Sequence, residues 1–253
     1  MVGTNVVDRA ADDESIAEWE RHAGWWHREF TGGVDVEYAE QILPLIDASL
    51  PSSGRVLDLG SGDGQVTRLA TARAGLAVGV DAVRAQVERA AALGGGSFVQ
   101  ARLSELPLRS ASCRAVVACL VLEHVSDLDA AFAEAARVLE PDGRLVAVIN
   151  HPILQTPGSG WIDDQVVDPP EQYWRIGPYL PEVTTVEEVD DGVDLTFHHR
   201  PLHRYVNGAS ACGLLLEYLE EPAPPPAYLE RYWSFPAADT VPRLALLRFR
   251  NLP

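Results

Sequence analysis

At positions 56–65 the chain reads Val56-Leu57-Asp58-Leu59-Gly60-Ser61-Gly62-Asp63-Gly64-Gln65. The apolar run at its start predicts a buried strand, and the glycine-rich turn that follows it opens a helix. Glycine lets the backbone come close to a ligand, and the first turn of a helix offers unpaired N–H groups to an anion. These ten residues therefore predict a strand, a ligand-binding turn and a helix in succession.

Short apolar strands alternate with helices on both sides of this turn. We expect strands over residues 55–59, 76–80, 97–101, 115–120 and 144–150, and helices over 64–73, 84–93 and 128–139. Such alternation is typical of an α/β protein with a doubly wound parallel sheet and helices on both faces. The carboxyl ends of the strands then meet at one edge, where sheets of this kind bind ligands.

The segments that flank this core differ from it in composition. The first 13 residues are polar and we expect them to be frayed, with helices following at 15–30 and 37–49. Residues 152–190 are rich in Pro, Gly, Asp and aromatic residues and show little periodicity, which is typical of a functional loop or lid. Further strands are expected at 193–198, 214–220 and 243–250, and a helix at 202–212.

Four parts of the chain follow from these differences. We expect an N-terminal helical lid (1–35), a ligand-binding core (36–151), a lid or substrate-recognition insertion (152–200), and a C-terminal helix with the final strands of the same sheet (201–253).

The overall composition favours some classes of protein over others. Among 253 residues there are 20 Lys and Arg, all of them Arg, against 37 Asp and Glu, so the formal net charge is −17. This charge repels phosphate backbones and anionic lipids, and we expect neither a nucleic-acid nor a membrane partner. No Cys-x-x-Cys pair, secretory signal or apolar run of membrane-spanning length is apparent. We expect a soluble, cytoplasmic protein.

The spacing of the glycines separates two classes of ligand. A dinucleotide-binding loop needs a glycine three residues after its second one, where this chain has Gln65. Asp58 at the strand end and Asp63 inside the loop would repel a pyrophosphate. The same carboxylates suit a ligand with a cationic group, such as an ammonium or a sulfonium.

A further acidic residue, Asp81, ends the second expected strand. It follows the glycine turn by about 20 residues, a distance at which an acid accepts hydrogen bonds from the hydroxyls of a ribose. Asp81 also precedes the helix that we expect to begin at Arg84, and it is suited to cap that helix. The two roles are compatible.

Five motifs in order carry a resemblance to a known family. They are Asp58-x-Gly60-x-Gly62-x-Gly64, Asp81, Leu106-Pro107-Leu108, Leu122-Glu123-His124-Val125 and Leu139-Glu140-Pro141-Asp142-Gly143-Arg144-Leu145. With them the chain resembles the class I S-adenosylmethionine-dependent methyltransferases, and especially the small-molecule group that includes the ubiquinone and menaquinone enzymes. The resemblance covers residues 35–151 strongly and the remainder weakly.

The resemblance implies a fold, a cofactor and a reaction. The fold is a doubly wound, Rossmann-like sheet of seven strands with the last one antiparallel, completed by helical and loop lid elements. The cofactor is S-adenosylmethionine, whose methyl group is transferred in line to an O, N or C nucleophile of a small molecule. Two alternatives are an NAD(P)-dependent oxidoreductase and a non-catalytic S-adenosylmethionine-binding regulator.

The resemblance also implies which residues hold the cofactor. Asp58 and the glycine-loop backbone would hold its methionine end, Asp81 its ribose, and Ala82 or Val83 its adenine. The family often has an Asp that bonds the adenine amino group where this chain has Arg102, which has no acceptor atom. The expected cofactor-binding residues are Asp58, Gly60, Ser61, Gly62, Gly64, Asp81, Ala82, Arg102, Leu103 and Cys119.

A methyl acceptor that carries a proton needs a base near the carboxyl ends of the strands. Three histidines are candidates: His124 after the fourth expected strand, His151 after the fifth, and His199 before the helix at 202–212. Each of them also has a plausible structural role. The histidine spacings match no zinc pattern, and we expect no metal.

Aromatic side chains in the lid segments are suited to form the walls of an acceptor site. We expect Trp25, Trp161, Trp174 and Tyr179 to bind the substrate, whereas Trp19 and Trp26 are expected to belong to the core. The identity of the acceptor and the oligomeric state are left open.

Overall fold

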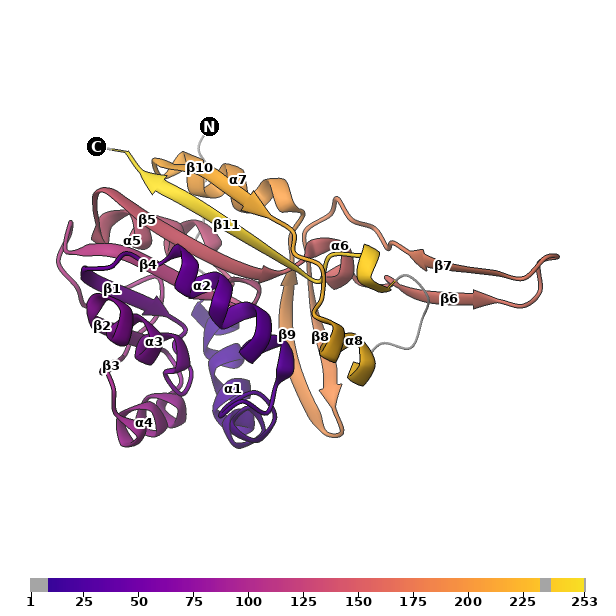
Figure 1. The fold of residues 1–253 in the computed structure, drawn as a ribbon, viewed down its shortest axis with the longest axis horizontal. Helices are drawn as coiled ribbons and strands as arrows, with labels where there is room; N and C mark the ends of the chain where they lie inside the picture. Colours follow the sequence, from indigo (N-terminus) through magenta and orange to yellow (C-terminus); the bar gives the residue numbers. More distant parts are fainter. Residues whose placement is uncertain (1–8, 233–237, 253) are drawn as a thin grey trace.

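The computed structural model describes residues 9–232 and 238–252. Within them lies a seven-stranded sheet with the order β10-β11-β5-β4-β1-β2-β3 (Figure 1). Strand β11 runs antiparallel to both of its neighbours, as expected for the last strand, and the pairs among β1 to β5 are parallel. The strands are β1 (Gly54–Leu59), β2 (Gly75–Asp81), β3 (Ser97–Gln100), β4 (Cys113–Cys119), β5 (Leu139–Asn150), β10 (Leu214–Glu220) and β11 (Leu244–Asn251).

Helices cover both faces of this sheet, because each strand of its centre is apolar on both sides. On one face, Phe132 of α5 and Tyr205 of α7 pack with Phe249 of β11. On the other face, Ile46 of α2 and Val66 of α3 pack against the same strands. The core helices are α2 (Leu43–Ser49), α3 (Gln65–Ala74), α4 (Arg84–Leu93), α5 (Leu128–Val138) and α7 (Leu202–Ala211).

Two expectations about the N-terminal helices are wrong in detail. Helix α1 spans Arg9–Glu29, so residues 9–13 are helical rather than frayed, and contacts of its first turns with Arg102 and Ser126 hold them. The expected helix at 37–49 is divided into a π-helical turn, η1 (Tyr38–Ile42), and α2. Pro44 lies in the first turn of α2 directly after η1, and it has no N–H to donate to the turn before it.

The segment 152–200 contains the strand expected at 193–198, here β9, and three further strands that its composition does not predict. It forms two antiparallel hairpins, β6 (Gly160–Asp164) with β7 (Glu171–Arg175), and β8 (Val183–Asp190) with β9 (Val193–His199). The first hairpin projects away from the body of the molecule, whereas the second lies beside α1 (Figure 1). The shorter elements are η2 (Leu122–His124), α6 (Pro152–Gln155), α8 (Pro226–Tyr232) and η3 (Ala238–Thr240).

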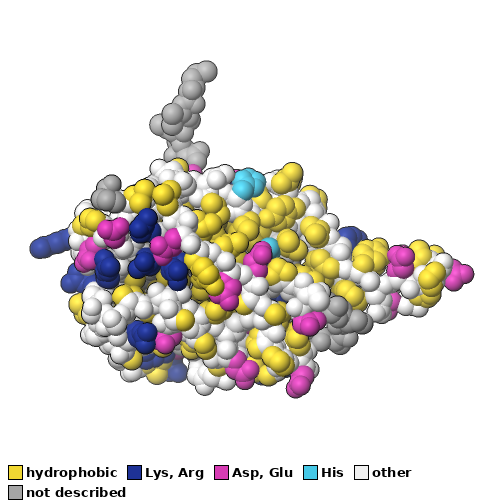
Figure 2. Space-filling model, turned by 45° about the horizontal axis from the view of Figure 1, so that its top comes forward, with side chains coloured by type: hydrophobic (Ala, Val, Ile, Leu, Met, Phe, Trp, Pro, Cys, Tyr) yellow, Lys and Arg dark blue, Asp and Glu magenta, His cyan; other side chains and the backbone are white. Residues whose placement is uncertain are grey.

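Strand β10 forms one edge of the sheet and exposes apolar side chains. These are Leu215, Leu216, Tyr218 and Leu219. Figure 2, which turns the top of Figure 1 toward the viewer, shows hydrophobic side chains exposed over the middle of that face, basic ones gathered mainly at its left end, and acidic ones spread over the face. The register between β10 and β11 shifts between Leu216 and Tyr218. Such irregularities twist an edge strand and disfavour its pairing with other chains.

None of the helices in the described residues is long and apolar enough to cross a membrane. In the same part of the chain, no group of three or more His, Cys, Asp or Glu residues is placed to hold a metal ion.

Candidate functional site

A cavity lies at the carboxyl ends of β1, β2 and β4, beneath α1. With its open mouth it encloses a space of about 1010 Å³. Its walls come from the loops after β1 to β4, from α1 and from Tyr38. The lining residues are Asp12, Ser15, Ile16, Trp19, Trp26, Tyr38, Gly60, Ser61, Gly62, Asp63, Gln65, Asp81, Ala82, Val83, Gln86, Arg102, Leu103, Ser104, Cys119, Leu120, Val121, His124, Val125 and Asp127.

The glycine loop forms the floor of this cavity. Gly60, Gly62 and Gly64 have φ values of 66°, 52° and 89°, which favour glycine. The N–H groups of Gly60 and Ser61 both donate to the carbonyl of Val80, at 2.8 and 3.0 Å, and join the loop to the end of β2. A Cβ atom at Gly60 would lie 2.3 Å from Cγ2 of Val121, so the cavity wall packs directly on this backbone.

Asp81 joins the glycine loop to the loop after β2. Its carboxylate accepts hydrogen bonds from the N–H groups of Gly62 at 2.9 Å and Val83 at 2.8 Å. Burial raises the pKa of Asp81 to about 6. The start of α4 is capped by another residue, since Glu20 of α1 accepts from the N–H of Arg84. Asp81 is thus a cavity-lining acid rather than the side-chain cap of α4.

Two residues of the expected cofactor set, Asp58 and Gly64, do not line the cavity. Asp58 is fully buried behind the loop, where it accepts a hydrogen bond from Oγ1 of Thr67 at 2.6 Å. Burial raises the pKa of Asp58 to about 7. Gly64 is the residue before α3, and a side chain there would meet Phe98 at 2.6 Å. Both residues shape the loop from behind.

The cavity wall contains Ser61, which we expected in the cofactor-binding set, and Asp63, the acid expected inside the glycine loop. The hydroxyl oxygen of Ser61 is buried and has no hydrogen-bond partner within the described residues. Asp63 lines the cavity while its carboxylate lies 3.4 Å from Arg68. Buried polar atoms without partners are rare in folded proteins. The Ser61 hydroxyl therefore fits a polar ligand group at this end of the cavity.

His124 is the histidine that the structure brings to the cavity. Its Nδ1 lies 2.9 Å from the carbonyl oxygen of Thr196 on β9. Because a carbonyl only accepts, Nδ1 carries the hydrogen and Nε2 carries the lone pair of the neutral ring. Trp19 packs edge-on against the ring at 4.9 Å, and desolvation lowers the pKa of His124. The imidazole is held neutral with a fixed orientation.

The other two candidate histidines lie elsewhere. His151 accepts a hydrogen bond from the N–H of Ile153 and pairs through Nε2 with Glu221 at 2.7 Å, so it caps α6. His199 is buried and donates from Nε2 to the carbonyl of Tyr179 at 2.8 Å. Neither histidine lines the cavity, because His151 is bonded to α6 and to the segment after β10, and His199 to the loop between the two hairpins.

The four aromatic residues that we expected at the acceptor site also lie outside the cavity. Trp25 donates to Asp190 at 2.8 Å and packs against β9. Trp161 and Trp174 face each other across the β6–β7 hairpin. The hydroxyl of Tyr179 accepts from the N–H of Leu202 at 2.9 Å.

Trp19 and Trp26, which we expected in the core, line the cavity instead. They lie seven residues apart on α1 and share a face with Asp12, Ser15 and Ile16. This seven-residue spacing is visible in the sequence and was the signal that could have identified the inner face of α1.

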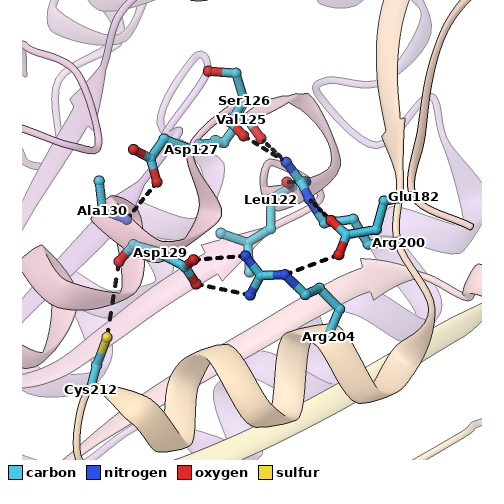
Figure 3. A network of polar contacts seen from close by, with 10 residues as sticks. All are labelled: Leu122, Val125, Ser126, Asp127, Asp129, Ala130, Glu182, Arg200, Arg204 and Cys212. Atoms are coloured by element: carbon cyan, nitrogen blue, oxygen red, sulfur yellow. Dashed lines mark hydrogen bonds and ion pairs between the residues drawn. The ribbon is translucent and has the colours of Figure 1, made fainter. Parts of the chain in front are cut away.

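A buried arginine that sequence reasoning missed holds the loop that carries His124. Arg200 donates to the carbonyls of Leu122, Val125 and Ser126 at 3.1, 2.6 and 3.0 Å (Figure 3). Glu182 lies near both Arg200 and Arg204. Arg204 forms a bidentate ion pair with Asp129, with both N–O distances at 2.8 Å. The network ties the segment after β9 to the loop after β4.

The sheet order, the glycine loop and the cavity define a Rossmann-like α/β protein with a ligand site at the carboxyl ends of its strands. Residues 57–147 match the family model described as a methyltransferase domain. A 134-residue segment is 33% identical to 27-O-demethylrifamycin SV methyltransferase of Amycolatopsis mediterranei. That match covers 49% of this chain and 48% of the relative, so the chain spans about half the length of that protein.

Solved structures give similar matches over more of the chain. An S-adenosylmethionine-dependent methyltransferase from Mesorhizobium loti is 29% identical with a TM-score of 0.67, over 82% of this chain and 96% of that one. A SAM-dependent methyltransferase from Methanosarcina mazei shares the fold at 18% identity and a TM-score of 0.55, over 83% and 97%. Residues 57–147 are thus a methyltransferase domain, and the chain shares the fold of S-adenosylmethionine-dependent methyltransferases. Its cofactor is S-adenosylmethionine.

Proposed function

We propose that this protein transfers a methyl group from S-adenosylmethionine to an O, N or C nucleophile of a small molecule. The observation that carries the proposal is the single cavity that joins the glycine loop and Asp81 to His124 and an aromatic wall. One end has the polar groups that an amino acid and a ribose need. The other is apolar and closed by α1, which suits an organic acceptor and excludes water.

The residues around the glycine loop fit the cofactor. We propose that Asp81 accepts from the ribose hydroxyls, while the backbone of Gly60 to Gly62 and the Ser61 hydroxyl hold the methionine end. Ala82 and Leu103 would pack on the adenine. Cys119 lines the wall as a neutral thiol, since burial raises its pKa. Asp58 and Gly64 would act from behind, by shaping the loop.

When bound, S-adenosylmethionine supplies a methyl group already activated on a sulfonium sulfur. The chain aligns the acceptor, so that the S–CH₃ bond breaks as the bond from nucleophile to methyl forms. Where the acceptor is a hydroxyl, we propose that Nε2 of His124 takes its proton. A hydroxyl acceptor is supported by the rifamycin relative, whose name describes an O-methylation.

The division into functional parts is also a proposal. Helix α1 would act as the lid of the region 1–35, of which residues 1–8 lie outside the described part. The 152–200 insertion would support it, because Glu18 accepts from the N–H of Thr196 at 3.0 Å and Trp25 bonds to Asp190. The net charge of −17 supports an acceptor other than a nucleic acid or a lipid surface.

The cofactor assignment is tested by thermal unfolding with S-adenosylmethionine, S-adenosylhomocysteine, NAD and NADP. A ligand at about a hundred times its Kd adds about 2.7 kcal/mol of stability, a shift of roughly 5–10 °C for a chain of this size. We expect this shift with the first two compounds alone. A shift confined to a nicotinamide cofactor would support the oxidoreductase alternative and contradict the proposal.

His124→Asn is expected to slow methyl transfer to a hydroxyl acceptor by about a hundredfold, without changing the Kd for S-adenosylhomocysteine. The Asn amide can still donate to the carbonyl of Thr196 as Nδ1 does, so the variant removes only the Nε2 base. The lowered pKa of His124 means that the wild-type rate should rise with pH and reach its plateau at a lower pH than a free imidazole base would give. Labelled methyl transfer to 27-O-demethylrifamycin SV and to simple phenols measures this rate. An unchanged rate and pH profile in the variant would remove His124 from the reaction.

A further inference from the structure

An ion pair lies where α1 meets the loop after β3. Asp12, in the first turns of α1, and Arg102, in that loop, both line the cavity together with Leu103. Oδ2 of Asp12 is 3.6 Å from Nη1 of Arg102, and Oδ1 accepts from the hydroxyl of Ser126. The side chain of Asp12 is only 14% exposed, against 66% for the neighbouring Asp13, which also pairs with Arg102.

The hydrogen bonds of this pair are incomplete. Nη1 of Arg102 is buried and has no hydrogen-bond partner within residues 9–232 and 238–252, since 3.6 Å from Asp12 is too long for one. Nη2 is occupied by Asp13. The pair therefore presents an acceptor, the Asp12 carboxylate, beside a donor that is not satisfied. Leaving a buried donor unsatisfied is costly, and a ligand that accepts from it would recover that cost.

Adenine carries the complementary pattern. Its 6-amino group is a donor, and the adjacent ring atom N1 is an acceptor. Arg102 itself has no acceptor atom for the amino group, so the acceptor must come from another residue. Asp127 also lines the cavity, where it is the N-cap of α5, but Asp12 is the acid that lies beside the unsatisfied Nη1 of Arg102.

We propose that Asp12 accepts a hydrogen bond from the 6-amino group of the cofactor's adenine and that Nη1 of Arg102 donates to N1. This inference rests on the proposed function, because it needs the adenine to lie against Ala82 and Leu103. The lid helix then supplies the base-recognition residue, and a purine with the opposite pattern is rejected by both side chains.

The test compares the Kd values of S-adenosylhomocysteine and S-inosylhomocysteine, measured by calorimetry on the whole chain. The inosine analogue has an oxygen in place of the amino group and a hydrogen on N1, so both contacts become repulsive. We expect the wild-type protein to bind it at least about tenfold more weakly. Asp12→Ala should raise the Kd for S-adenosylhomocysteine by about tenfold and reduce the difference in affinity between the two ligands.

Asp13→Ala is the matched control, because it removes the other carboxylate from Arg102 and leaves Asp12 in the cavity. We expect it to keep the full discrimination. Asp12→Asn retains one acceptor oxygen and guards against a folding defect in the alanine variant. Equal discrimination in the wild type and in both Asp12 variants would overturn the inference while S-adenosylhomocysteine still binds. Failure of the wild type to bind S-adenosylhomocysteine at all would overturn the proposed function as well.

Discussion

Replacing Gly60 with alanine is expected to abolish cofactor binding. The new Cβ would lie 2.3 Å from Cγ2 and 2.7 Å from Cβ of Val121, and φ at this position is +66°. The side chain of Val121 and the glycine loop must therefore move apart, and both of them line the cavity. Overpacking of this kind costs about 1–3 kcal/mol, to which the positive φ adds about 1 kcal/mol. Calorimetry with S-adenosylhomocysteine and urea unfolding measure the two effects.

Gly32→Ala separates the clash from the backbone cost. Gly32 has a φ of +68°, close to that of Gly60, and a Cβ there would meet nothing within 4 Å. We expect it to lose about 1 kcal/mol of stability and to bind S-adenosylhomocysteine normally. Normal binding by Gly60→Ala as well would show that the contact with Val121 yields and that the loop does not need glycine there.

Asp81→Ala should weaken S-adenosylhomocysteine binding by at least about tenfold and by as much as a hundredfold. The variant loses the acceptor proposed for the ribose and also the bonds that hold the N–H groups of Gly62 and Val83. Asp81→Asn keeps one acceptor oxygen without the charge, and an intermediate affinity is expected. Wild-type affinity in the alanine variant would contradict the assignment of Asp81 to the ribose.

The pKa of Asp81 gives this prediction a pH dependence. Burial raises the pKa from 3.8 to about 6, so the folded protein holds this proton more tightly than the unfolded chain does. The carboxylate therefore lowers the stability of the free protein as pH rises from about 4 through about 6. Ligand binding has the opposite sign, because two hydroxyl donors need the ionised form. Affinity should fall below about pH 6 in the wild type and remain flat with pH in Asp81→Ala.

The core of the fold could be predicted from the sequence because its signals are local. Strands β1, β2, β4 and β5 each contain a short buried apolar run, and the turn at Gly60 to Gly64 marks the ligand edge. Of the four hairpin strands in the 152–200 segment, only β9 was predicted in this way. Strand β7 is largely exposed and β6 is largely half-buried, so neither has a buried face that an alternation of apolar and polar residues would report.

The predictions of site residues likewise succeeded where the signal is local and failed where it is not. Residues at or shortly after the end of a strand, such as Gly60, Asp81, Leu103 and Cys119, line the cavity as expected, because all carboxyl ends of parallel strands share one edge. Residues far from this edge in sequence were assigned less well. His199 and Trp174 lie elsewhere, whereas Trp26 faces the cavity.

By itself, the sequence determined the doubly wound sheet, the glycine loop and the class of ligand, since these depend on residue types at short, regular spacings. Only the tertiary structure decided which face of α1 covers the cavity, which histidine reaches it, and how Arg102 is paired with Asp12. The physical reason is distance along the chain. Such contacts join segments many residues apart, and their partners are chosen by the packing of the whole molecule rather than by any local pattern.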